Sequence, residues 1–227
     1  MRTWLGSLGR RHEAIGEPAE LPFGLTVVLA VVVGALTVVA ASGAGAASVG
    51  DPLHRVRAAT VRIDASGCGG ARTATGVRLD DGRVLTNRHA VVGDEVRVDG
   101  KVASEVEVAQ GPDLAVVRTP EPGIGIPLAE ASAAPGDEVW MASTRDGALT
   151  MTRARISSTV AGTGPNDPEW AWRLDVSVVP GDSGSPVVDV DGRLVGLVYA
   201  AEYGSTAALV VPVAFLGGPT VTPAPCT

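Results

Sequence analysis

Beyond residue 50 the chain is a series of short apolar runs separated by turn sequences. Asp-Gly pairs separate several runs, and such a pair between β-prone segments favours a tight hairpin, because both positions accept positive φ. No long helical period interrupts the series, so only a short helix at 213–216 is expected. The region is therefore predicted to be all-β, with about a dozen short strands in a sandwich or a pair of barrels. The expected strands cover residues 59–63, 76–79, 83–86, 95–98, 102–108, 114–118, 138–142, 149–156, 172–179, 186–190, 193–200 and 207–211.

The segment before this region is charge-free from residue 21 to residue 50. Its core, residues 23–41, consists of Val, Leu, Ala, Gly and Thr with one Phe. A helix of about 20 apolar residues spans the hydrocarbon layer of a membrane. Three arginines precede the segment, and no basic residue follows it before Arg55. The positive-inside rule then predicts a cytoplasmic N-terminus and an exported remainder.

Two interpretations of this segment remain open. In the first, residues 1–20 are a cytoplasmic segment, 21–42 a transmembrane signal anchor and 43–55 a linker, which gives a single-pass protein of the cell membrane. In the second, the segment is a signal peptide, because residues 44–46 (AGA) resemble a cleavage site. A cleaved chain would be secreted. Both interpretations place the later residues outside the cytoplasm.

Composition excludes several classes of partner and cofactor. The net charge of −7 makes binding to nucleic acid unfavourable, because phosphates repel an acidic surface. Only two cysteines and three histidines occur, far apart in sequence, so neither a structural zinc site nor any other metal site is expected. Aromatic residues make up 4% of the chain, which predicts an aliphatic core.

A serine between glycines follows the expected strand at 172–179, in the sequence PGDSGSP of residues 180–186. Glycines allow the backbone to turn sharply and bring N–H groups close to a substrate carbonyl. The N–H groups of Gly181 and Ser183 are therefore candidates for an oxyanion hole, with Ser183 as the nucleophile. An ordinary surface turn is the alternative, since the same residues are common in turns.

Two further segments could complete a catalytic triad. His89, in the sequence TNRHAV of residues 86–91, lies at the end of a β-prone run, and it is the only histidine in the predicted β region. Asp113 directly precedes the apolar run LAVV, where a carboxylate can orient a histidine ring. Taken singly, either residue could be structural. Together the three candidates occur in the order His, Asp, Ser, which is found in chymotrypsin and differs from that of subtilisin and the α/β-hydrolases.

These motifs make the chain resemble a trypsin-like serine protease with the chymotrypsin fold. It is most similar to bacterial extracytoplasmic proteases of the HtrA type, without their PDZ domain. The resemblance implies two six-stranded antiparallel β-barrels. The apolar segment described above adds one N-terminal transmembrane helix before them. The protease domain would cover 56–218, with barrel 1 at about 56–130 and barrel 2 at about 131–218. Residues 219–227 would form a C-terminal tail. The resemblance also implies that His89 and Asp113 come from the first barrel and Ser183 from the second.

The resemblance also suggests the residues that bind substrate. Ser177, six residues before the nucleophile, would lie at or near the base of the primary pocket. Ala200, Ala201 and Glu202 would form one wall. The absence of an acidic residue at the base favours an apolar or small side chain before the cleaved bond. Asp182 has no evident freed N-terminus to pair with, so it needs another partner or solvent.

The two cysteines, Cys68 and Cys226, lie in a region expected to be exported, where disulfides persist. They are predicted to form a bridge that pins the tail to the first barrel, and two free thiols are the alternative.

The sequence as a whole predicts a serine endopeptidase that acts on proteins or peptides through an acyl-enzyme and needs no cofactor. Its membrane partner would be reached through the N-terminal helix, and the sequence does not determine an oligomeric state. A catalytically silent protease fold that binds or scaffolds at the cell envelope is the alternative function.

Overall fold

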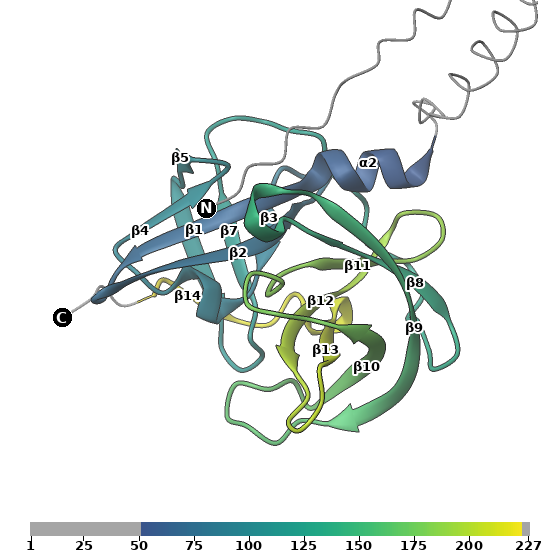
Figure 1. Ribbon diagram of the computed structural model, residues 1–227. Helices are drawn as coiled ribbons and strands as arrows, with labels where there is room; N and C mark the ends of the chain where they lie inside the picture. The colour runs from purple at the N-terminus through teal and green to yellow at the C-terminus, as the bar shows by residue number, and fades with distance from the viewer. Residues whose placement is uncertain (1–50, 224–227) are drawn as a thin grey trace, which may run out of the picture. The chain divides into compact units, whose positions relative to one another are not determined.

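The computed structural model describes residues 51–223 (Figure 1). No helix among them is long and apolar enough to cross a membrane. The predicted cytoplasmic segment, the membrane segment at 21–42 and Cys226 lie outside the described residues.

The first β unit is a curled sheet of eight strands in the order β14-β6-β7-β3-β2-β1-β4-β5. Its pairs are antiparallel, and β1 and β2 form the longest hairpin. Between β4 and β5, Asp99 and Gly100 have φ values of 50° and 80°, as expected for the Asp-Gly turn. The strands are β1 (Thr60–Gly67), β2 (Gly70–Arg78), β3 (Val84–Thr86), β4 (Glu95–Val98), β5 (Lys101–Val102), β6 (Glu105–Ala109), β7 (Ala115–Arg118) and β14 (Thr220–Val221).

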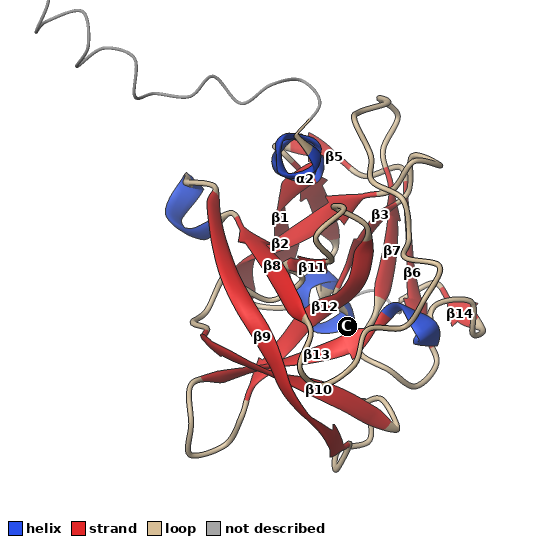
Figure 2. Cartoon of the chain, turned by 90° about the vertical axis from the view of Figure 1, so that its right-hand side faces the viewer, coloured by secondary structure: helices blue, strands red, loops and turns tan. Residues whose placement is uncertain are grey.

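The second β unit is a closed barrel of six strands, in the order β10-β13-β12-β11-β8-β9. Figure 2 shows it beside the first unit, with β9 and β10 on its outer side. The strands are β8 (Glu138–Ser143), β9 (Thr150–Ala161), β10 (Trp170–Ser177), β11 (Pro186–Val188), β12 (Leu194–Ala201) and β13 (Ala207–Pro212). The 3₁₀ helices η2 (Arg145–Gly147) and η3 (Val213–Phe215) follow β8 and β13, and η3 lies where a short helix is expected from the sequence.

The prediction of two six-stranded barrels is correct for the second unit and wrong for the first. Each edge of the first sheet is a strand of only two residues, β5 or β14, which is too short to close a barrel. A groove of about 670 Å³ lies along this open side, and residues 93–96, 102–106 and 222–223 line much of it. Strand β14 pairs with β6, so part of the predicted tail belongs to the first sheet.

A helix also replaces the end of the predicted linker. Helix α2 (Pro52–Ala59) is preceded by its N-cap residue Asp51, whose carboxylate accepts the N–H of Leu53 at 3.0 Å. Pro52 occupies the first turn, where its missing N–H costs nothing. The Asp-Pro pair is the sequence signal for this helix. Its buried residues, Val56 and Ala59, pack into the core.

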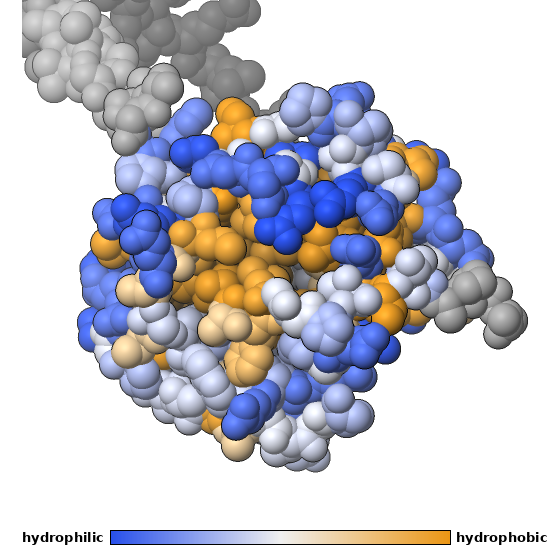
Figure 3. All heavy atoms as spheres, turned by 180° about the vertical axis from the view of Figure 1, so that it is seen from behind, coloured by the Kyte–Doolittle hydropathy of each residue, from blue (hydrophilic) through white to orange (hydrophobic). Residues whose placement is uncertain are grey.

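Three apolar clusters form the core. One lies within the first sheet, one within the closed barrel, and the third joins the two units and helix α2. The buried side chains are almost all Val, Ala, Leu and Ile, as the low aromatic content predicts. Seen from behind, apolar residues remain visible in the middle of the face, with polar residues around them (Figure 3). The shared cluster holds the two β units against each other, so that loops from both can meet.

Candidate active site

His89 and Asp113 meet because two strands of the first sheet are neighbours. His89 lies in the 3₁₀ helix η1 (Arg88–Val91), directly after β3. Strand β7 pairs with β3 so that Thr86 lies opposite Ala115. His89 follows Thr86 by three residues and Asp113 precedes Ala115 by two, so the antiparallel register places both at one end of the sheet.

The carboxylate of Asp113 contacts His89 at two points. One oxygen lies 2.5 Å from the ring Nδ1, and the other accepts the backbone N–H of His89 at 2.9 Å. Asp113 is almost fully buried. Its backbone carbonyl accepts a hydrogen bond from the side-chain amide (Nδ2) of the buried Asn87 at 2.9 Å. Because an ionised carboxylate only accepts hydrogen bonds, Nδ1 carries the proton and Nε2 is left as an acceptor.

Ser183 reaches the same histidine from the closed barrel. Its Oγ lies 2.9 Å from Nε2 of His89 and donates to that nitrogen when the ring is neutral. The loop that carries Ser183, residues 179–184, joins β10 to β11. Its last residue has φ of +81°, and a Cβ on Gly184 would lie 1.9 Å from the carbonyl oxygen of Thr75. Only glycine fits there, which explains the second glycine of the serine motif.

The two N–H groups expected to form an oxyanion hole lie in this loop. Among the described residues, neither the N–H of Gly181 nor that of Ser183 donates to a protein acceptor. Gly181 has φ of +100°, in the region that favours glycine. Free, neighbouring N–H groups beside a nucleophile are available to a substrate oxygen.

A pocket of about 230 Å³ opens beside Ser183. Ala200 and Ala201, which the resemblance assigns to a wall of the primary pocket, line it together with Val178, Val179, Pro180 and Val198. Ser177 and Glu202 are not among its lining residues. The Ser177 hydroxyl instead lies 2.7 Å from that of Thr206, and Glu202 pairs with Arg173 at 2.8 Å. Both side chains are therefore engaged outside the pocket.

A second pocket, also of about 230 Å³, lies on the side of His89 and Asp113. Arg88 and the loop residues Asn166 and Asp167 line it, and Arg88 donates to Asn166 at 3.2 Å.

In β12 the pKa of the buried Tyr199 is raised to about 12, mainly by burial and further by the charges of Asp167 and Asp113. Within residues 51–223, no three His, Cys, Asp or Glu side chains are placed to hold a metal ion.

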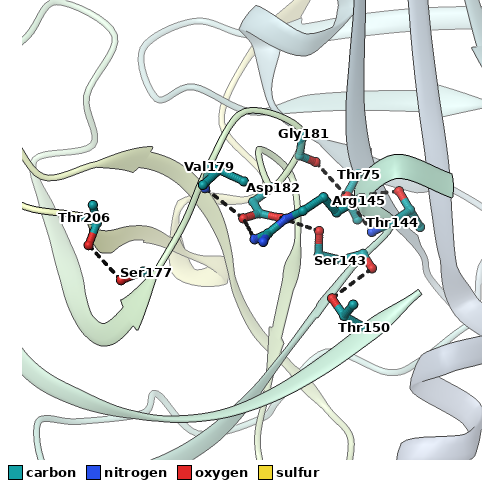
Figure 4. Close-up of polar contacts among 10 residues, drawn as sticks. All are labelled: Thr75, Ser143, Thr144, Arg145, Thr150, Ser177, Val179, Gly181, Asp182 and Thr206. Carbon is teal, nitrogen blue, oxygen red and sulfur yellow. Dashed lines mark hydrogen bonds and ion pairs between the residues drawn. The ribbon is translucent and has the colours of Figure 1, made fainter. Parts of the chain in front are cut away.

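Asp182, for which the sequence shows no partner, is fully buried and bonded (Figure 4). It accepts the hydroxyl of Ser143 at 2.5 Å, the N–H of Val179 at 2.9 Å and Nε of Arg145 at 3.2 Å. Arg145 also forms an ion pair with it through Nη2. Neither Ser143 nor Arg145 is singled out by a local sequence motif, because each is distant from Asp182 along the chain.

Comparison with known protein families gives a match over much of this domain. A family model described as a trypsin-like peptidase domain matches residues 74–197, which include all three triad candidates. Two curated relatives from strains of Mycobacterium tuberculosis, the serine proteases MT3772 and Rv3671c, are each 31% identical over 222 residues. The alignments cover 88% of this chain and 53% of each relative, so the chain spans about half their length.

Solved structures are similar as well. The active form of the Rv3671c protease from M. tuberculosis superimposes with a TM-score of 0.64 at 25% identity, covering 80% of this chain and 89% of that one. The HtrA-type protease AlgW, solved with a tripeptide, gives a TM-score of 0.63 at 23% identity, covering 72% and 59%. The second likeness concerns the fold alone.

Proposed function

We propose that this chain, which belongs to the trypsin-like peptidase family, is a serine endopeptidase that cleaves peptide bonds through an acyl-enzyme on Ser183. The observation that carries this proposal is the hydrogen-bonded series from Asp113 through His89 to Ser183, with contacts of 2.5 Å and 2.9 Å. The three side chains come from two different β units and form one continuous series of hydrogen bonds.

In the proposed reaction, Ser183 Oγ attacks the substrate carbonyl carbon and His89 Nε2 takes its proton. Asp113 holds the ring in the tautomer that leaves Nε2 free, and it stabilises the imidazolium that forms. The imidazolium then donates its proton to the leaving amine. Water, activated by the same histidine, hydrolyses the ester and releases the acid product.

The negative charge that develops on the carbonyl oxygen requires donors beside Ser183. The N–H groups of Gly181 and Ser183 are assigned this role because they lie in the loop that carries the nucleophile and have no protein acceptor among the described residues. Donors fixed before the reaction stabilise the oxyanion without reorganisation.

The proposed substrates are proteins or peptides with a small or apolar side chain before the cleaved bond. The pocket beside Ser183 supports this preference, because alanine, valine and proline side chains line most of it. Its volume of about 230 Å³ is enough for an apolar side chain up to the size of a single ring, since a cavity of about 150 Å³ holds benzene. The only charged residue that lines this pocket is Asp182, which is buried and already paired with Arg145. A charged substrate side chain would therefore have no ion-pair partner there.

The proposal also includes a location. Residues 21–42 are proposed to act as a membrane anchor that holds the protease domain on the extracytoplasmic side, or as a signal peptide that releases it. The uncharged run from 21 to 50 and the arginines before it support this arrangement.

Reaction of the full chain with a fluorophosphonate tests the activity directly. We expect intact mass spectrometry to find one covalent adduct on the wild type and none on Ser183→Ala, which retains the fold. The same substitution is expected to abolish cleavage of an unfolded protein substrate. Lack of an adduct on folded wild-type protein would contradict the proposal and favour a silent protease fold that serves as a binding module.

A further inference from the structure

The loop of residues 179–184 must hold two N–H groups in place, yet its own internal bonds are few. Within it, the N–H of Asp182 donates to the carbonyl of Val179 at 3.0 Å, and the N–H of Val179 donates to the carboxylate of Asp182 at 2.9 Å. Two of its residues are glycines with positive φ, which lowers the barrier to other backbone conformations. Both bonds join Val179 to Asp182, so the rest of the loop depends on contacts from outside it. The N–H of Gly184 donates to Val198 of β12 at 2.8 Å, and Figure 4 shows the contacts from Thr75, Ser143 and Arg145.

The first restraint is a single residue of the other β unit, Thr75 in β2. Its backbone N–H donates to the carbonyl of Ser183 at 2.8 Å, and its hydroxyl donates to the carbonyl of Gly181 at 3.0 Å. These two carbonyls belong to the peptide groups on either side of the one that supplies the Ser183 N–H. Fixing both neighbours fixes the direction of that N–H.

The direction of the Thr75 hydroxyl is itself determined. A hydroxyl has one proton and two acceptor sites, whereas the carbonyl of Gly181 can only accept. The proton of Thr75 therefore goes to Gly181. Both acceptor sites face Thr144, whose N–H donates at 3.1 Å and whose hydroxyl lies 3.1 Å away. Thr75 is fully buried, so no water competes for these bonds.

The second restraint holds the opposite side of the loop. The carboxylate of Asp182 accepts from Ser143, Arg145 and the N–H of Val179. Ser143 is the last residue of β8, and Thr144 and Arg145 follow it directly in the chain. One short segment therefore supports the loop twice, through Asp182 directly and through Thr75 by way of Thr144.

We infer that Thr75 is a positioning residue for the oxyanion hole, and that its hydroxyl holds the Gly181–Ser183 backbone ready for substrate from the opposite β unit. This inference rests on the proposed function, because it assigns Thr75 a role in that reaction. Thr75 touches neither the nucleophile side chain nor His89 in any hydrogen bond of the described residues. Its effect is transmitted through the backbone.

The test compares full-length Thr75→Val, Thr75→Ser and Thr60→Val with the wild type. Thr75→Val keeps the shape and removes the hydroxyl, whereas Thr75→Ser restores it. Thr60 is the matched control, because its buried hydroxyl also donates to a backbone carbonyl, that of Val56 at 2.8 Å. Among the described residues it has no hydrogen bond to the loop. The readouts are the rate constant of fluorophosphonate inactivation, kcat and KM for a peptide substrate, and urea unfolding.

We expect Thr75→Val to lower the inactivation rate constant and kcat by about 10- to 100-fold, with little change in KM. This reduction is smaller than the one that follows removal of a direct oxyanion donor. Thr75→Ser should stay within about threefold of the wild type, as should Thr60→Val even where it unfolds at lower urea. A folded Thr75→Val that reacts within threefold of the wild type would overturn the inference.

Two further outcomes keep the test decisive. If Thr75→Val does not fold, Thr144→Val replaces it, since it removes the hydroxyl beside Thr75 from a half-buried position. We expect a smaller loss of rate, about three- to tenfold, and an unchanged rate would again overturn the inference. A wild type that never reacts with the fluorophosphonate would overturn the proposed function, and the role of Thr75 with it.

Discussion

At the scale of single residues, the buried polar side chains in and around the proposed triad are informative about how the site is held. Asn87, Asp113, Asp182 and Thr75 are all nearly or fully buried polar residues, and each bonds to the backbone or side chain of a site residue. A buried polar group without a partner costs about 1–3 kcal/mol, so such bonds restrict the residues they join to one arrangement. The site is therefore positioned by its surroundings before substrate arrives.

Tyr199 gives a pH prediction at this scale. Burial, with Asp167 and Asp113 nearby, raises its pKa to about 12 from the usual 10.0. The folded protein therefore retains the phenol proton that the unfolded chain loses above pH 10. Unfolding then releases a proton, so stability should fall between pH 10 and 12, by up to about 2–3 kcal/mol. Below pH 10 this group should contribute no pH dependence.

Only one other tyrosine, the fully exposed Tyr203, is present, so Tyr203→Phe isolates the signal. We expect the ultraviolet absorbance of the phenolate in this variant to appear with a midpoint near 12. A midpoint near 10 would mean that Tyr199 is not held in a buried, negatively charged environment.

At the scale of elements, the loop between β10 and β11 depends on close contact with β2. Gly184→Ala would place a methyl group 1.9 Å from the Thr75 carbonyl oxygen, and the new alanine would have to keep the positive φ of Gly184. Gly204→Ala shares the strained φ of +74° but meets nothing within 4 Å. The difference between the two variants therefore isolates the contact between the two β units.

We expect Gly204→Ala to lower the unfolding free energy by about 1 kcal/mol, the cost of an alanine at positive φ. Gly184→Ala should cost several kcal/mol more or shift the loop, and the fluorophosphonate rate should fall with it. Urea denaturation of both variants measures the difference. Equal losses of stability would show that the loop does not press against β2.

Secondary structure also shows where local patterns are reliable. The hairpins at Asp99-Gly100 and between β2 and β3 follow from their turn residues, because turn geometry depends on adjacent positions. β1 and β2 extend beyond the predicted runs to Gly67 and Gly70, since their pairing with each other stabilises residues that a glycine-rich sequence alone would assign to a turn. Helix α2 falls in a predicted linker, although Asp51-Pro52 is a helix-start signal.

At the scale of the whole molecule, the tail returns to the first sheet. Strand β14 pairs with β6, and Pro223 lines the open groove beside Asp94. The N–H of Asp94 donates to Ser66, next to the turn that holds Cys68. Cys226 is three residues beyond Pro223, and three residues span about 10 Å. Because Cys226 lies outside the described residues, the bridge from Cys68 to Cys226 stays a prediction.

We expect thiol titration of the denatured, unreduced protein to find no free thiol, and two after reduction. Reduction should lower the unfolding free energy by at most about 4–5 kcal/mol, the loop-closure value for a link that joins the two ends of the domain. Cys68→Ser should be destabilised to a similar extent. Two free thiols in exported, unreduced protein would contradict the bridge.

The sequence by itself determined the all-β class, most hairpin turns and the candidates His89, Asp113 and Ser183, because periodicity, turn chemistry and short motifs depend on neighbouring residues. The tertiary structure alone decided that the first sheet stays open, that Ser177 and Glu202 lie outside the pocket beside Ser183, and which residues hold the loop of residues 179–184. Thr75 lies 106 positions from Gly181 and Arg145 lies 37 from Asp182. Contacts between residues so far apart in the sequence depend on how the chain folds and packs, and a local sequence pattern does not predict them.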